Sequence, residues 1–115
     1  MLNLFQHPSS FILFLVKPKQ PCTYILASQK RGTLYIGVTS DLPQRIWQHR
    51  HSLAAGFASR YRVFRLVHAE FFDDMAAAIK REKQLKNWHR PWKLNLIEEG
   101  NPDWCDLAKV WGIAE

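Results

Sequence analysis

Cysteine is scarce in this sequence of 115 residues: only Cys22 and Cys105 occur, and they form no Cys-x-x-Cys motif. This scarcity argues against a disulfide framework or a zinc ribbon and is compatible with the reducing cytoplasm. The apolar run 11–16 covers only six residues, whereas a helix needs about 20 to span a bilayer. The sequence also contains no P-loop, no dinucleotide-binding fingerprint, no convincing Ser-His-acid arrangement and no internal repeat.

Positive charge, by contrast, is plentiful. Sixteen Lys and Arg residues stand against ten Asp and Glu, which gives a formal net charge of +6 and a sequence pI of about 9.6. Such an excess favours an acidic partner, of which nucleic acid is the commonest. A basic surface without such a partner is the other interpretation. The length suits one domain with a hydrophobic core of its own.

The first 20 residues differ in composition from the rest. Their apolar run is followed by two prolines, Pro18 and Pro21, which break regular structure. We therefore expect residues 1–20 to form a tail outside the fold, disordered or loosely docked, and residues 21–115 to form the domain. A weak secretory signal or a membrane anchor is the alternative, although no Lys or Arg precedes the apolar run as a signal requires.

The stretch 23–50 predicts a β-hairpin that runs directly into a helix. Residues 23–27 and 34–38 are rich in aromatic and β-branched side chains, and a polar link containing Gly32 separates them. This order of segments is typical of two antiparallel strands joined by a hairpin loop slightly longer than the minimum.

The register of this hairpin decides where its two tyrosines lie. A hairpin symmetric about its link pairs Tyr24 with Gly37 and Leu26 with Tyr35, so both tyrosines lie diagonally on one face. Gly37 has no side chain, and we expect open space beside Tyr24 at this point.

The residues that follow the hairpin predict a helix. The Thr-Ser-Asp run at 39–41 can cap its start, and Pro43 is tolerated in a first turn. Arg45 and His49 are four residues apart and therefore share one face, whereas His51 points away from His49, which argues against a shared metal. A purely structural unit, with the tyrosines in the core and Arg45 and His49 on a solvated surface, is the other interpretation.

A third strand and a second helix follow. Residues 61–72 have apolar side chains on both faces, so we expect a central strand. Asp73 or Asp74 then caps a helix from about Met75 to Trp88, which Pro91 stops.

Glu82 is the unusual residue of this helix. It falls on the otherwise apolar stripe of a well-patterned helix, where a carboxylate costs stability unless it is paired or binds a cation. An ion pair with an arginine, such as Arg45, and a divalent metal ion, which prefers carboxylate oxygen, are the two possibilities.

Taken together, these residues resemble the GIY-YIG nuclease family. Tyr24 and Tyr35 are eleven residues apart, Arg45 follows ten residues later and His49 four after that. The second tyrosine stands in an intact Tyr-Ile-Gly motif. The first motif departs from the family, because Cys-Thr-Tyr at 22–24 replaces Gly-Ile-Tyr and keeps only the tyrosine. The sequence Arg-Glu-Lys-Gln-Leu-Lys around Glu82 resembles the small stand-alone branch of the family.

The resemblance implies a fold and an activity. The fold is α+β, a small three-stranded antiparallel β-sheet flanked by helices in the order β-β-α-β-α-α. The activity is endonucleolytic hydrolysis of phosphodiester bonds in DNA with a single divalent ion, Mg²⁺ or Mn²⁺, in DNA repair, recombination or processing. A cytoplasmic enzyme of this size would select DNA by its structure or depend on a targeting protein. RNA is a further possible partner, and no membrane is implied. A catalytically inactive nucleic-acid-binding or partner-recruiting module is the alternative function.

The family also implies roles for individual residues. Tyr24 would act as general base or as its partner, with Tyr35 beside it. A free tyrosine has a pKa near 10, so His49 would help to remove the proton. Arg45 would bind the phosphoryl oxygens, and Glu82 would hold the metal. Val38 stands where some relatives have an activating lysine.

Asparagines and tryptophans in the C-terminal third complete the candidates. Asn95 lies where the family has an active-site asparagine and would position a phosphate or a water of the metal. Asn101 is the weaker candidate, since turn and cap chemistry explains it. We expect the five tryptophans to be core anchors rather than base-stacking platforms, although Trp47 or Trp88 could be exposed.

Overall fold

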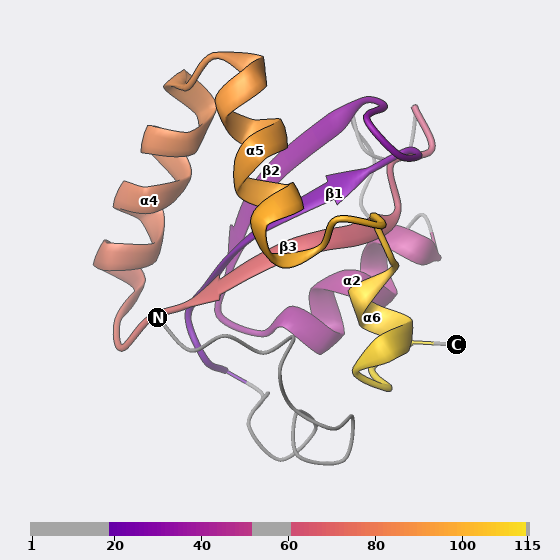
Figure 1. Ribbon diagram of the computed structural model, residues 1–115. Helices are drawn as coiled ribbons and strands as arrows, with labels where there is room; N and C mark the ends of the chain where they lie inside the picture. The colour runs from indigo at the N-terminus through magenta and orange to yellow at the C-terminus, as the bar shows by residue number, and fades with distance from the viewer. Residues whose placement is uncertain (1–18, 52–60, 115) are drawn as a thin grey trace.

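A three-stranded antiparallel sheet lies at the centre of the computed structural model, which describes residues 19–51 and 61–114. The strands are β1 (Cys22–Ala27), β2 (Leu34–Thr39) and β3 (Arg65–Phe71), in the spatial order β2-β1-β3 (Figure 1). The predicted α+β fold, a small antiparallel sheet flanked by helices, is confirmed. The tail predicted for residues 1–20 lies almost entirely outside the described residues.

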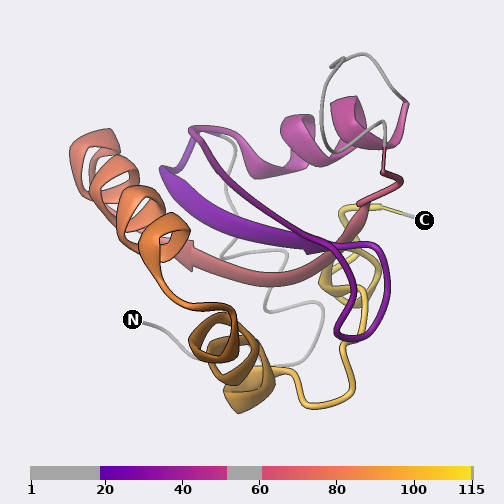
Figure 2. The same ribbon diagram turned by 90° about the horizontal axis from the view of Figure 1, so that it is seen from above.

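In the described ranges, two pairs of helices cover the two faces of the sheet. They are α2 (Leu42–Arg50), α4 (Met75–Asn87), α5 (Arg90–Gly100) and α6 (Leu107–Val110). Figures 1 and 2 show α4 and α5 gathered on one side of the molecule and α2 and α6 on the other.

The alternation of side chains along β1 gives each face its own core. Tyr24 and Leu26 pack with Ile46 of α2 and with Trp111 beside α6. Ile25, the residue between them, points to the opposite face. That second core also contains Ala27, Ile36, Val67, Leu85, Ile97 and Trp104. Every residue of β1 is buried, as expected for the middle strand of a sheet covered on both sides.

The position predicted for the third strand is wrong. β3 pairs only with β1 and forms an edge of the sheet. Its register against β1 shifts between Ile25 and Leu26, so that Leu66 joins the α2 side while Val67 and His68 both lie on the α4 side. This β-bulge breaks the regular alternation. Both faces of β3 are apolar although it is an edge strand, because helices cover both sides of the sheet and Leu66 and Val67 belong to different cores.

The helical part of the chain differs from the prediction in one element. The second predicted helix is present as α4, which is capped by the side chain of Asp74. The last helix of the predicted order is present as α6. The helix α5 that precedes it was not predicted: Pro91 occupies its first turn and so starts this helix as well as ending the one before.

The prediction that the tryptophans are core anchors is correct for two of them. Trp104 and Trp111 are buried. Trp47 and Trp92 are about half exposed, with 51% and 55% of their surface accessible, and Trp88 is partly buried. In the part of the chain that the structure describes, no helix is both long and apolar enough to cross a membrane.

Candidate active site

The hairpin places two tyrosines side by side, as its predicted register requires. Tyr24 pairs with Gly37 and Leu26 pairs with Tyr35 across β1 and β2. The tyrosine rings therefore lie on the α2 side of the sheet, with their centroids 6.3 Å apart. Tyr24 is 1% exposed, and Tyr35 is partly buried and packs against the same core.

The space beside Gly37 is not open, contrary to the prediction. A Cβ atom at this position would lie 2.5 Å from both Cζ and the hydroxyl oxygen of Tyr24. The ring of Tyr24 thus lies directly over the backbone of β2, in the volume that any other residue would fill. Glycine is needed here because the ring passes so close to the strand.

Replacing Gly37 by alanine is expected to destabilise the fold by about 1–3 kcal/mol, because overpacking a buried site displaces its neighbours. The displaced group is the hydroxyl of Tyr24, so any activity of the site should fall as well. Urea denaturation measures the first effect. Wild-type stability of Gly37→Ala would contradict the close approach of the Tyr24 ring to the strand.

Helix α2 brings two further side chains to Tyr24. The Asp41 side chain caps the helix by accepting a hydrogen bond from the backbone N–H of Gln44. One turn further, Arg45 Nε donates to the Tyr24 hydroxyl at 3.3 Å. His49 follows four residues later and places Nε2 3.0 Å from the same hydroxyl. The Arg45 guanidinium and the His49 imidazole, one helical turn apart, therefore contact the same hydroxyl oxygen of Tyr24.

Burial sets the protonation states of this group. Loss of solvation raises the pKa of Tyr24 to about 12, against the opposing effect of the hydrogen bond from Arg45. Loss of solvation, together with the positive charge of Arg45, lowers the pKa of His49 to about 4. At neutral pH the site therefore consists of a neutral phenol, a neutral imidazole and a guanidinium cation. A neutral imidazole can accept the phenolic proton at Nε2.

The low pKa of His49 predicts a loss of stability in mild acid. The folded state holds His49 neutral down to about pH 4, whereas the unfolded chain protonates it near pH 6.5. As the pH falls through this window the unfolded state binds the proton first, so the free energy of unfolding should decrease by up to about 3 kcal/mol. Urea titrations at several pH values measure this decrease in the free energy of unfolding. His49→Gln should flatten the dependence, and the exposed His89→Gln should leave it unchanged.

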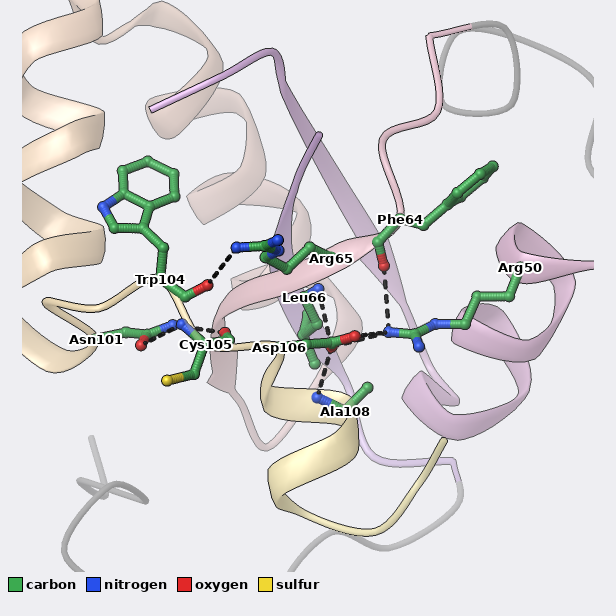
Figure 3. Close-up of polar contacts among 9 residues, drawn as sticks. All are labelled: Arg50, Phe64, Arg65, Leu66, Asn101, Trp104, Cys105, Asp106 and Ala108. Carbon is green, nitrogen blue, oxygen red and sulfur yellow. Dashed lines mark hydrogen bonds and ion pairs between the residues drawn. The ribbon is translucent and has the colours of Figure 1, made fainter. Parts of the chain in front are cut away.

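A polar contact between distant segments anchors α2 beside the sheet (Figure 3). The Arg50 guanidinium binds both carboxylate oxygens of Asp106, at 2.8 and 2.7 Å, and donates to the carbonyl of Phe64. Asp106 also accepts from the backbone N–H groups of Leu66 and Ala108. Sequence reasoning missed this pair, because its members are 56 residues apart and follow no local pattern.

Glu82 lies on α4, where the helical pattern predicted it. It occupies the sheet-facing stripe between Ala78 and Leu85, which are both fully buried. Its own side chain is 15% exposed, and its carboxylate lies 3.5 Å from Lys86 Nζ. The ion pair with Arg45, one of the two possibilities left open by the sequence, does not form; Arg45 contacts Tyr24 and Gln48.

Glu82 and the tyrosines belong to opposite faces of the sheet. Tyr24 and Tyr35 pack on the α2 side, whereas α4 packs on the other side against β1 and β2. The structure therefore brings Tyr24, Tyr35, Arg45 and His49 together but does not join Glu82 to them by direct contact. β2 is the edge strand between the two groups.

The two asparagines have different surroundings. Asn95 is exposed on α5. Asn101 is 4% exposed and ends α5: its side-chain amide donates to the carbonyls of Val67 and Cys105, and its oxygen accepts from Cys105 N–H. The turn-and-cap interpretation of Asn101 is thus confirmed.

Comparison with known proteins agrees with this geometry. Residues 20–95 match the family model described as the GIY-YIG catalytic domain. The chain belongs to the GIY-YIG family. The match includes both tyrosines, Arg45, His49, Glu82 and Asn95, so this GIY-YIG domain has nuclease chemistry as its family function and DNA as the implied substrate.

Several relatives of this GIY-YIG domain carry the name UPF0213. The UPF0213 protein of Staphylococcus saprophyticus is 39% identical over 71 residues, which cover 62% of this chain and 87% of the relative. That of Syntrophus aciditrophicus is 36% identical over 81 residues, covering 70% and 91%. The solution NMR structure of a UPF0213 protein from Bacillus halodurans has 27% sequence identity and a TM-score of 0.49, covering 79% of this chain and 96% of that one.

GIY-YIG nucleases generally depend on a divalent metal ion, and the donor set of this domain fits such an ion in one way. Within residues 19–51 and 61–114, no three His, Cys, Asp or Glu side chains form a ready-made cage. Mg²⁺ does not need one, because it commonly binds through one or two carboxylates, substrate phosphates and water. Glu82 suits this role, since its partner Lys86 is 54% exposed and free to move into solvent.

A second buried carboxylate lies on the α4 side of the sheet and was not predicted. Glu70, 4% exposed on β3, accepts from Arg81 Nε at 2.9 Å and from Arg81 NH2 at 3.2 Å. His68 Nε2 lies 2.7 Å from the same carboxylate. These contacts hold the pKa of Glu70 below its usual value, against its burial. The carboxylate of Glu70 is thus bound by an arginine and a histidine that tie β3 to α4, whereas the carboxylate of Glu82 pairs with the exposed Lys86.

Proposed function

We propose that this domain is a divalent-metal-dependent endonuclease that hydrolyses phosphodiester bonds in DNA. The observation that carries the proposal is the Tyr24 hydroxyl held between His49 Nε2 and Arg45 Nε, at 3.0 and 3.3 Å. Burial alone requires one hydrogen-bond partner for a tyrosine hydroxyl, whereas the Tyr24 oxygen contacts both an imidazole and a cation. The Glu82 carboxylate would hold the ion, which supplies positive charge against the charge that builds up on the phosphoryl and leaving oxygens.

The pKa values of the site favour a proton relay over a phenolate. With a pKa of about 12, Tyr24 does not ionise at neutral pH. As water attacks phosphorus, its proton passes to the Tyr24 oxygen while the phenolic proton passes to His49 Nε2, so that neither residue has to ionise beforehand. The negative phosphate raises the pKa of His49 from its low value in the free protein, which makes the imidazole a better base once DNA is bound.

Arg45 has two tasks in this mechanism. Its Nε donates to Tyr24 and its Nη1 to Gln48, at 3.2 Å, which fixes the guanidinium plane against the site. The fixed cation then binds the phosphoryl oxygens, where preorganised positive charge stabilises the transition state most. Exposed Asn95 on α5 would position a neighbouring phosphate.

The scissile strand would cross the edge of the sheet at β2. This path takes it from the tyrosines on one face to Glu82 on the other, so that one phosphate reaches both groups. We propose that DNA structure or a targeting protein selects the substrate, because phosphate contacts carry no sequence information. Such an enzyme would act in DNA repair, recombination or processing. The exposed free Cys105 suits the reducing cytoplasm.

The test is a cleavage assay on labelled linear, nicked, flapped and branched DNAs with Mg²⁺ or Mn²⁺. We expect cleavage of at least one branched or flapped DNA, none in chelator, and a rate lower by about 10²-fold or more with Tyr24→Phe. Binding without cleavage under all metal conditions would reject the enzyme and identify a nucleic-acid-binding module. Cleavage at the wild-type rate in Tyr24→Phe would reject Tyr24 as the proton-transfer group.

A further inference from the structure

The excess positive charge of this chain is concentrated at the corner between α4 and α5. Residues 80–93 contain six Lys and Arg residues and one Glu, a net charge of +5 out of +6 for the whole sequence. Only Trp88 and His89 separate the two helices, and a contact between Lys93 and Lys86 joins them across this junction. The six are Lys80, Arg81, Lys83, Lys86, Arg90 and Lys93. A concentration of this kind attracts phosphate.

An exposed indole lies among these cations. Trp92 has 55% of its surface accessible. Its aromatic neighbours Trp88 and His89 meet it edgewise, at interplanar angles of 82° and 86° and centroid distances of 6.0 and 5.4 Å. Neither neighbour is stacked parallel on Trp92. An exposed aromatic ring beside basic side chains is the combination that stacks unpaired bases in single-stranded nucleic acid.

Side-chain contacts support the rings of this corner from behind. Arg81, bound through two nitrogens to the buried Glu70, places its guanidinium carbon 5.0 Å from the ring centroid of Trp88. Trp88 in turn supports Trp92. A network that orders a surface before binding lowers the cost of binding there.

Further contacts tie α5 to its surroundings. Arg90 donates to the carbonyls of Arg31 and Gly32 in the hairpin loop. Lys93 Nζ donates to the carbonyl of Lys86, at 3.4 Å, across the helix corner. Both cations are therefore positioned by backbone atoms rather than neutralised by carboxylates.

We propose that this corner binds an unpaired segment of DNA, with a base stacked on Trp92 and phosphates held by Lys86, Arg90 and Lys93. The proposal deepens the nuclease function and rests on it: it makes DNA with a flap or single-stranded branch the substrate. Lys86 lies one helical turn from Glu82, with their charged groups 3.5 Å apart. An unpaired strand on the corner therefore leads directly to the carboxylate that holds the metal.

The other exposed tryptophan provides a matched control. Trp47 is 51% exposed, but its ring is already stacked on His51, with centroids 4.3 Å apart and an interplanar angle of 23°. It also lies on α2, away from the basic corner. Trp47→Ala removes an indole of equal exposure without touching the proposed surface.

The experiment measures affinity in chelator for a short single-stranded DNA, a flapped duplex and the same duplex without the flap. Trp92→Ala should weaken binding of the first two about tenfold or more and of the blunt duplex less than twofold. Trp47→Ala should leave all three within twofold, and Trp92→Phe should restore most of the lost affinity. Thermal melting of each variant checks that the substitution at these half-exposed positions leaves the fold intact.

Two results would overturn the proposal. One is equal affinity of Trp92→Ala and Trp47→Ala for the flapped DNA. The other is tighter binding of single-stranded RNA of the same sequence, which would make RNA the occupant. A cleavage assay on the same DNAs keeps this test separate from that of the nuclease. If flap binding depends on Trp92 but the protein cuts no DNA, only the proposed enzyme activity is rejected. If the protein cuts flapped DNA but its affinity for that DNA does not depend on Trp92, only the proposed binding surface is rejected.

Discussion

Replacing Tyr24 by phenylalanine is expected to lower the single-turnover rate of DNA cleavage by about 10²-fold or more, the usual effect of losing a proton-transfer group. The phenyl ring still fills the space over Gly37, so packing is retained. What disappears is the oxygen that contacts both His49 Nε2 and Arg45 Nε. Because those two groups then lose a buried partner, stability should fall by about 1–2 kcal/mol.

Tyr61→Phe is the matched control for this experiment. Tyr61 is 50% exposed and lies before β3 rather than on the two hairpin strands that carry the paired tyrosines. It loses the same hydroxyl and should cleave at the wild-type rate. A wild-type rate in Tyr24→Phe as well would give the motif a structural role, and the nuclease mechanism would have to start from another residue.

The parts of the site that sequence could predict are those set by local geometry. Pairing of Tyr24 with Gly37 follows from the symmetry of a short hairpin, since a slip by one residue would turn the side chains to the wrong face. The common face of Arg45 and His49 follows from helical spacing, whereas their contact with Tyr24 depends on how α2 packs against the sheet. The local pattern could not show that the ring of Tyr24 fills the space over Gly37, because this depends on how a buried side chain settles in three dimensions.

The predictions that were wrong, and the features that were not predicted, depend on contacts between segments far apart in the sequence. Both faces of β3 are apolar because helices cover both sides of the sheet, so that Leu66 and Val67 contribute to different cores, and not because the strand is central. The bulge that puts Val67 and His68 on the same side cannot be recognised from the sequence until the partner strand is known.

The buried ion pairs show the same dependence. Arg50 with Asp106, and Glu70 with Arg81, are brought together only when helices pack on the sheet. In the sequence each of these residues is one charge among many. Exposure of Trp92 is equally hidden, since an indole in a helix usually marks a core position.

Replacing Glu82 by glutamine is expected to abolish metal-dependent cleavage while DNA binds as well or better, because a negative charge facing phosphate is removed. Stability in chelator should stay within about 0.5 kcal/mol or rise, since the charge that Glu82 pairs with belongs to the exposed Lys86 and such pairs contribute little. One cleavage gel and one melting curve in chelator measure the two effects.

Glu70→Gln is the same chemical change at a carboxylate on the same side of the sheet, and the opposite pattern is expected. Glu70 is buried between Arg81 and His68, so its replacement leaves the partly buried Arg81 without its carboxylate partner and should cost about 2 kcal/mol or more. Any protein that still folds should retain metal-dependent cleavage. If Glu82→Gln destabilised the protein as much as Glu70→Gln, Glu82 would be a structural residue and the metal would need another carboxylate. If both variants were stable and only Glu82→Gln were inactive, the charge of Glu82 would serve the reaction and not the fold.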